Sequence, residues 1–238
     1  MNFIQRFCFT FTYTYTEKQG IAMKHAPRPR RKQDDLNRIV SSINSAAKLY
    51  QQFLVGRKFL YAFDGRFIEV IYKAQNFRHL TGVETSLSAK RFYQAAVHDQ
   101  LQTSQIHFSK THPYDLCLRK VKHLHEIATL AASESFLLEE IHTNTQSYKF
   151  GTTDLNFTLC MNQELDTAGK AISECFVVQS LRDEDCFQRA KNVYPVTHIL
   201  SKPNDAHYYT DIDYLEQGES LSTLPVPIQS MISNTEEL

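Results

Sequence analysis

Apolar residues recur at three- and four-residue spacing from Asp34 to about Leu54, and this period predicts an amphipathic helix. The apolar stripe consists of Leu36, Ile39, Val40, Ile43, Ala47, Tyr50 and Leu54. Asp34 and Asp35 stand at the start, where carboxylates suit the positive end of a helix dipole. The runs KFLYAF and FIEVIY then flank Asp64-Gly65, a pair that accepts the positive φ angles of a tight turn. This segment predicts a β-hairpin.

Shorter periodic segments follow the hairpin. They predict a helix from Ser88 to about His98, a short strand over 104–109, and a helix from Pro113 to about Ala131. The remainder predicts strands in SFLLEEI, QSYKFGT, LNFTLCM, ECFVVQSLR and YPVTHIL, with a short helix over DEDCFQRAK. The predicted fold class is therefore α+β: N-terminal helices and a β-hairpin followed by a mostly antiparallel sheet.

Both ends of the chain differ from this central part. Phe7 to Thr16 alternates aromatic residues with threonine at strand period, and a proline-broken basic run follows from Lys24 to Lys32. The run at the start has no secretory cleavage pattern, and we expect Met23 to be the native start. Residues 1–33 are expected to be a flexible extension and linker, residues 34–202 the folded domain, and residues 203–238 a partly disordered acidic tail. That tail holds seven acidic residues and neither lysine nor arginine.

The formal net charge is zero, which argues against a generally nucleic-acid-coating protein. The charge is nevertheless divided along the chain. Residues 1–125 carry 20 Lys/Arg against 8 Asp/Glu, and residues 126–238 carry 6 against 18. Two interpretations fit: the halves dock electrostatically, with the acidic end as a solubilising tail, or the basic front forms an anion-binding face.

Several function classes lose their usual signals. The five cysteines include no CxxC pair, which fits free thiols in a reducing cytoplasm and argues against a thiolate zinc site. The chain has no GxGxxG, GxxxxGK[ST], GxSxG or HExxH motif, so no nucleotide cofactor and no metal are expected. There is also no apolar run near 18 residues, which excludes a spanning helix and a membrane partner of that kind.

Two polar segments carry candidate chemistry. The first, Asn76 to Gly82, is expected to be a loop holding Arg78, His79 and Thr81. The second, Ser109 to Asp115, places Lys110 and His112 before a predicted helix start, where free N–H groups bind anions. Two histidines can divide general base and acid work near neutral pH. Turn capping by His79 and ordinary helix entry by His112 are the alternatives.

Further basic and hydroxyl residues extend this picture. Lys120, Lys122, His123 and His125 are expected to share one helix and to form a solvated or phosphate-facing basic surface. His123 and His125 point about 200° apart on a regular helix, so they cannot jointly bind one metal. Thr153 is expected in a turn, where its hydroxyl is a candidate phosphate contact, and Arg182 follows a predicted strand.

Six segments, in this order, carry a resemblance to a known family: INSAAKLY, FIEVIYKAQNFRHLTGV, LSAKRFY, IHFSKTHPYDL, YKFGTTDLNFTLCM and QSLRDEDCF. Together they cover about Ile43 to Leu200. With these segments the chain resembles a phage- and prophage-associated family of the barnase–EndoU–colicin–RelE-like (BECR) nuclease superfamily, the fourth phage type of that fold.

The resemblance implies a metal-independent ribonuclease domain over residues 34–202. Such enzymes cleave RNA by attack of the ribose 2′-hydroxyl, leaving a 2′,3′-cyclic phosphate. On this chain it implies base and acid roles for His79 and His112, and phosphate stabilisation by Lys110 and Arg182. Arg78 and Thr81 would support them. A barnase-like glutamate has no clear counterpart other than Glu69.

The leading hypothesis is thus a cytoplasmic endoribonuclease of a phage or mobile element in a bacterial host, acting as a toxin or effector. RNA and a cognate inhibitor protein are the expected partners, without a cofactor. One alternative is a catalytically inactive RNA- or partner-binding module of the same fold. Another is a packing protein whose basic and acidic halves drive self-assembly.

Overall fold

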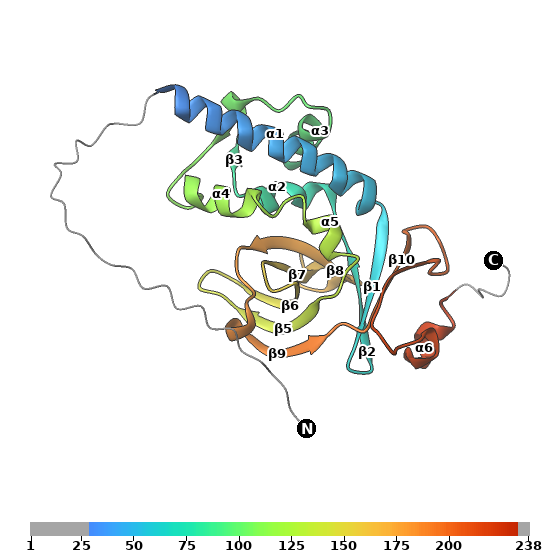
Figure 1. Cartoon of the computed structure of the whole chain (residues 1–238). Helices are drawn as coiled ribbons and strands as arrows, with labels where there is room; N and C mark the ends of the chain where they lie inside the picture. Colours follow the sequence, from blue (N-terminus) through green and yellow to red (C-terminus); the bar gives the residue numbers. More distant parts are fainter. Residues whose placement is uncertain (1–28, 233–238) are drawn as a thin grey trace, which may run out of the picture.

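The computed structural model describes residues 29–232 (Figure 1). The predictions for residues 1–28, including the strand-like alternation and the start at Met23, lie outside the described residues. The chain forms helices and one hairpin first and then a large, mostly antiparallel sheet, so the predicted α+β class is confirmed. In Figure 1, helices α1 to α4 lie together on one side of this sheet.

Helix α1 (Pro29–Phe53) contains the predicted amphipathic segment and starts five residues earlier than Asp34. Its buried side is the predicted apolar stripe, with Ile39, Ile43, Ala47 and Tyr50 almost inaccessible to solvent. The predicted hairpin is also present, as β1 (Arg57–Phe63) and β2 (Arg66–Ile71).

The segment between the hairpin and the sheet is more helical than predicted. Residues 76–82 are not a loop: a 3₁₀ turn, η1 (Ala74–Asn76), leads into helix α2 (Phe77–Thr81). Buried Phe77 and Leu80 are three residues apart and anchor one side of this short helix to the core. Gly82 ends α2 at φ +74°, a conformation that favours glycine.

The helix predicted from Pro113 to Ala131 is broken into two. Helix α4 (Tyr114–Val121) is followed by turns and then by α5 (Ile127–Leu130). The preceding elements are β3 (Glu84–Thr85), α3 (Ala89–Val97), η2 (Thr103–Gln105) and β4 (Ile106–His107). Helix α3 is the predicted helix, with Ser88 accepting a hydrogen bond from the Arg91 N–H as its N-cap. Strand β4 lies within the predicted strand and pairs with β3, bringing Glu84 opposite His107.

The main sheet of the described residues has nine strands in the order β11-β10-β1-β2-β8-β7-β6-β5-β9. Its later strands are β5 (Phe136–His142), β6 (Ser147–Thr153), β7 (Thr158–Leu165), β8 (Ala171–Arg182), β9 (Ala190–Pro195), β10 (His198–Pro203) and β11 (Asp211–Leu215). The predicted single strand YPVTHIL is divided between β9 and β10. The helix predicted over DEDCFQRAK is only a 3₁₀ turn, η3 (Phe187–Arg189).

The sheet curls strongly. Strands β9 and β10 are joined by only Val196 and Thr197, yet they occupy distant positions in the strand order. Thr197 donates its N–H to the Ala62 carbonyl and Val196 to the Ser135 carbonyl, which ties the two ends of the sheet together. The main core fills the space between the curled sheet and the helices, and includes Phe63, Phe77, Leu124, Phe157 and Leu181.

The expectation of partial disorder after Lys202 is wrong for residues 203–232. This segment forms β11, the 3₁₀ turn η4 (Leu221–Thr223) and helix α6 (Val226–Gln229). Tyr209, Leu224 and Ile228 are buried against Leu60 and Leu200. The segment covers a face of β1 and β10, and its few apolar residues outweigh its acidic composition.

No helix among residues 29–232 is both long and apolar enough to cross a membrane.

Candidate active site

A cleft of about 590 Å³ opens between helix α4 and the ends of β6 and β8. Three segments line it: the start of α4 with the loop before it, the β5–β6 turn with β6, and the end of β8 with the loop after it. The lining residues are Thr111, His112, Leu116, Arg119, Lys120, Thr145, Tyr148, Ser180, Leu181, Arg182, Asp183 and Glu184. This is the region where two of the predicted catalytic residues, His112 and Arg182, come together.

Lys120 lies on the α4 wall of the cleft, close to α2. Its Nζ donates a hydrogen bond to the His79 carbonyl oxygen at 3.1 Å. Burial and the positive charge of Arg182 lower the pKa of Lys120 to about 8. The close approach of α2 and α4 depends on Gly82, where an added Cβ would lie 2.9 Å from Lys120 Cδ and 3.3 Å from Cys117 Cα. Lys120 is therefore held in a fixed position, and its lowered pKa makes its ammonium group a better proton donor than that of an ordinary lysine.

Arg182 lies at the end of β8, on the opposite wall. Its Nη2 donates to the Thr143 hydroxyl at 2.7 Å and to the Thr145 hydroxyl at 3.4 Å. Its Nε is buried and has no hydrogen-bond partner within residues 29–232. Because a buried N–H of a charged group normally has an acceptor, this guanidinium is suited to an anion entering the cleft.

His112 is held at the mouth of α4 by a compact polar network. Its Nδ1 lies 2.9 Å from Glu84 Oε1, and its backbone N–H donates to the Ser109 hydroxyl at 3.2 Å. The same Glu84 oxygen also accepts from the Ser109 hydroxyl at 2.5 Å and the Thr111 hydroxyl at 3.1 Å. The hydrogen bond from Ser109, with those from His112 and Thr111, holds the pKa of Glu84 below its ordinary value.

His79 lies beside the cleft and does not line it. It is in the last turn of α2, and its backbone carbonyl accepts the hydrogen bond from Lys120 Nζ. Partial burial, with the positive charges of Arg78, Lys120 and His112, lowers the pKa of the His79 imidazole. The two predicted histidines are thus near enough to influence one another, with Lys120 adjoining both.

Thr81 and Thr153 are not placed to bind a substrate. Both are fully buried. The Thr81 hydroxyl donates to the Arg78 carbonyl and accepts from the Val83 N–H, so it caps α2. The Thr153 hydroxyl donates to the Phe157 carbonyl at 2.6 Å and closes the β6–β7 turn. Both hydroxyls are therefore engaged within the fold, and the predicted phosphate contacts gain no support from their positions.

Three predicted basic residues also lie outside the cleft lining. Lys110 is exposed on the loop between β4 and α4. Arg78 donates from Nη1 to the Leu87 carbonyl at 3.4 Å, and Lys122 pairs with Asp183 at 2.6 Å. Lys120, which the sequence indicated only as part of a general basic surface, occupies the position expected for Lys110.

His123 is not on a solvated basic surface as predicted. It is buried, stacks on Phe157 with ring centroids 4.8 Å apart, and lies between two carboxylates. Its Nδ1 is 2.7 Å from Glu126 Oε2 and its Nε2 is 2.8 Å from Asp183 Oδ1. His123 thereby anchors the loop that follows Arg182 to the turn after α4.

Glu69, the suggested counterpart of a barnase-like glutamate, belongs to another cluster. It accepts from the Tyr209 hydroxyl at 2.6 Å and pairs with Lys58 at 3.0 Å. Its neighbour on β2, Val70, pairs with Phe176, six residues before Arg182 along β8. At about 3.3 Å per residue, roughly 20 Å of strand separates this level from Arg182. The carboxylate beside the cleft histidine is Glu84 instead.

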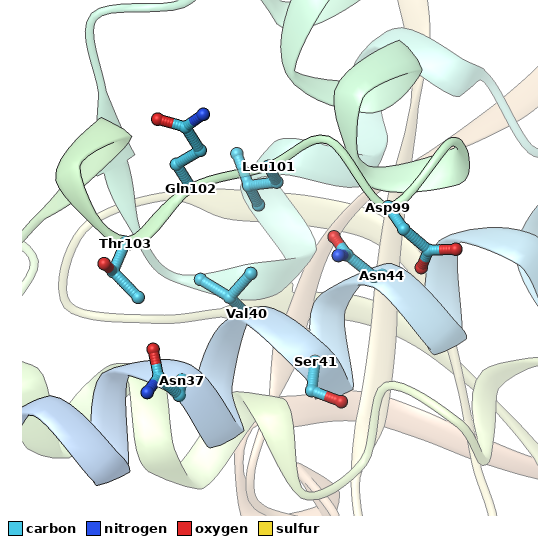
Figure 2. A pocket seen from close by; sticks show the side chains of 8 residues that line it. All are labelled: Asn37, Val40, Ser41, Asn44, Asp99, Leu101, Gln102 and Thr103. Atoms are coloured by element: carbon cyan, nitrogen blue, oxygen red, sulfur yellow. The ribbon is translucent and has the colours of Figure 1, made fainter.

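A second cleft, of about 430 Å³, lies between α1 and residues 99–103. Figure 2 shows Asn37 and Asn44 projecting from α1 towards this loop. Asn44 is 7% exposed, and its Oδ1 has no hydrogen-bond partner within the described part of the chain. No lysine, arginine or histidine lines this cleft, so it lacks the cations that distinguish the cleft beside α4.

Within residues 29–232, no three His, Cys, Asp or Glu side chains gather in a group able to hold a metal ion. The predicted independence from metal stays a prediction that an assay must test.

Comparison with known proteins agrees with the fold. The family model of PBECR4, described as phage-Barnase-EndoU-ColicinE5/D-RelE like nuclease 4, matches residues 42–218. No curated protein and no solved structure matches the chain. The family match includes both walls of the cleft, from Glu84 and His112 to Arg182, and covers most of the chain. The chain belongs to the PBECR4 family of BECR-type nucleases.

Proposed function

We propose that this protein is a metal-independent endoribonuclease that cleaves RNA through attack of the ribose 2′-hydroxyl. His112 is the general base, Lys120 the general acid, and Arg182 the group that binds the phosphate. A single observation carries the proposal: one cleft gathers an imidazole, an amine with a pKa of about 8, and a guanidinium with an unpartnered buried N–H.

Each of the three side chains has one role in the proposed reaction. His112 takes the proton of the 2′-hydroxyl through Nε2, since Nδ1 is bound to Glu84. The 2′-oxygen forms a bond to phosphorus while the bond from phosphorus to the 5′-oxygen breaks. Lys120 gives its proton to that leaving oxygen, and Arg182 stabilises the charge on the non-bridging oxygens. The products are a 2′,3′-cyclic phosphate and a 5′-hydroxyl end.

Lys120 is the better candidate for the acid because its pKa of about 8 leaves it protonated, yet ready to donate, near neutral pH. The alternative arrangement assigns the acid and base roles to His79 and His112, the pair predicted from the sequence. Partial burial and the neighbouring positive charges lower the pKa of His79, which disfavours the protonated form that an acid needs.

The test is incubation of labelled RNA with the full chain in EDTA, followed by analysis of the product ends. Cyclic-phosphate ends, and no cut at a position carrying 2′-deoxyribose, are the expected result. His112→Ala, Lys120→Ala and Arg182→Ala should each lower cleavage by about a hundredfold or more, the usual size of such effects. Lys90→Ala removes an exposed positive charge from α3, away from the cleft, and is the matched control.

His79→Ala separates the two acid assignments. A loss as large as that of Lys120→Ala would favour the histidine pair. Intact, folded protein that cleaves none of several RNAs would refute the nuclease proposal. Binding of RNA without cleavage would then favour the inactive binding module.

The wider biological role is part of this proposal. We expect action in the cytoplasm of a bacterial host as a phage or mobile-element toxin, with RNA as substrate and a cognate inhibitor as partner. The phage origin in the family description and the free thiols of the four described cysteines support it. Expression of the native chain in bacteria should arrest growth, and His112→Ala should relieve the arrest.

A further inference from the structure

Glu84 is the centre of the polar network behind His112. One of its oxygens lies within hydrogen-bonding distance of His112 Nδ1 and of the Ser109 and Thr111 hydroxyls. We infer that Glu84 is a positioning residue that fixes the tautomer and orientation of His112 for proton transfer at Nε2. This inference deepens the proposed function and rests on it for its catalytic meaning.

The direction of the hydrogen bond follows from the chemistry of the two groups. An ionised carboxylate only accepts, so the Nδ1 atom of His112 must carry the hydrogen. In the neutral imidazole the other nitrogen, Nε2, then has a free lone pair. Glu84 thus selects the form of His112 that can accept a proton from the side of the ring turned away from the carboxylate.

Glu84 is itself fixed, which a positioning residue requires. Its backbone is in β3, where it pairs with His107 of β4. The Ser109 hydroxyl, which donates to the carboxylate, also accepts the backbone N–H groups of Thr111 and His112. The carboxylate and the loop that carries His112 are therefore locked to the same hydroxyl, and the ring cannot turn without breaking these contacts.

The carboxylate also favours the product of proton transfer. When His112 accepts a proton at Nε2, it becomes a cation whose Nδ1–H still points at Glu84. The hydrogen bond between this cation and the carboxylate has a charge on both partners, so it is stronger than the bond from the neutral ring that it replaces. Lys120 and Arg182, both positive, line the same cleft, and the Glu84 carboxylate brings an opposite charge into contact with His112.

The experiment combines kinetics with histidine NMR on the full chain. Glu84→Gln keeps an acceptor oxygen but removes the charge, Glu84→Ala removes both, and Glu84→Asp keeps the charge on a shorter arm. The control is Glu126→Ala, which removes one of the two carboxylates that lie close to another histidine, His123. Rates are measured as kcat and KM over pH, and the ¹⁵N shifts of His112 report which nitrogen carries the hydrogen.

The expected result is a fall in kcat of about tenfold or more for Glu84→Gln and Glu84→Ala, with KM nearly unchanged, because the loss is in proton transfer. The acidic limb of the pH profile should move, and Glu84→Asp should recover part of the rate. His112 should carry its hydrogen on Nδ1 in the native chain and lose that preference in Glu84→Ala. Glu126→Ala should leave both readouts as they are.

Two outcomes would overturn the inference. One is native His112 with its hydrogen on Nε2. The other is RNA cleavage by Glu84→Gln with the native kcat and pH profile. If the native chain cleaves no RNA, the proposed function fails, while the NMR measurement still decides whether Glu84 fixes the tautomer of His112.

Discussion

Lys120 should set the alkaline limit of activity. Its pKa of about 8 arises from burial and from the charge of Arg182 across the cleft. The group is then about 90% protonated at pH 7 and about 10% protonated at pH 9. In the proposed mechanism Lys120 is the acid, so only the protonated fraction is active. The value of kcat/KM should therefore level off below pH 8 and fall about tenfold per unit well above it.

Lys120→Arg separates proton donation from simple electrostatic attraction. Arginine keeps the positive charge, but its pKa lies above 12, so it does not release a proton in the assay range. We expect Lys120→Arg to lose about a hundredfold in kcat on RNA and to show no fall near pH 8. A dinucleotide analogue with a nitrophenolate leaving group needs no acid, so its cleavage should be much less affected by the same substitution.

The assay is cleavage of a short labelled RNA from pH 5 to pH 10, with native protein, Lys120→Arg and the Lys90→Ala control. The reasoning is refuted if the native profile stays flat to pH 9.5, or if Lys120→Arg keeps the fall near pH 8. Equal losses on RNA and on the nitrophenyl substrate would remove Lys120 from the acid's role and leave it as a phosphate contact.

Other substitutions test the scaffold of the cleft and of the sheet. Gly82→Ala should lower the free energy of unfolding by about 1–3 kcal/mol, because φ is +74° and the new Cβ would press on Lys120 and on the α4 backbone; a urea titration with an unchanged midpoint would contradict this. Asn44→Leu should raise the free energy of unfolding by about 1 kcal/mol by removing a buried, unpartnered oxygen; a fall of that size in the same titration would mean that the oxygen is satisfied by a bound molecule. Deletion of residues 203–238 should leave the protein unfolded or aggregated, because it exposes the core around Leu60 and Leu200; a cooperative native-like melt of the truncated chain would refute this.

Long, strongly periodic segments could be predicted from the sequence, and α1 and the Asp64-Gly65 hairpin are the examples. Their patterns are local, so tertiary packing had little to change. Helix α2 was missed because its five residues are too few to show a period, and Phe77 and Leu80 form a buried face only against the core. The division between β9 and β10 was missed because a curled sheet, rather than any turn residue, separates them.

The residues of the candidate site were harder still to predict from the sequence, because most of their contacts are not local. His112 and Arg182 could be selected by residue type and by position at the ends of elements. Glu84 could not, because it meets His112 only through the pairing of two-residue strands β3 and β4, across 22 residues of intervening chain. Lys120 could be noticed, but its low pKa comes from burial beneath α2 and from Arg182, neither of which leaves a local signal. Thr153 illustrates the opposite problem. The sequence marked its hydroxyl as a candidate phosphate contact, but a hydroxyl in a turn often bonds within the turn itself, as this one does.

The division of charge along the sequence now has a structural meaning. Basic residues of the front half pair with acidic residues of the back half, which supports the interpretation that the halves dock. These pairs are Arg57–Asp211, Arg66–Glu139, Lys73–Glu164 and Lys122–Asp183. Such exposed pairs contribute little stability, about 0–1 kcal/mol each, but they neutralise part of the basic excess. Lys120, from the basic half, and Arg182, from the acidic half, have no carboxylate partner among the ion pairs of residues 29–232. The proposed anion-binding site therefore lies where the pairing between the halves is incomplete, and the excess of charge along the sequence does not by itself locate it.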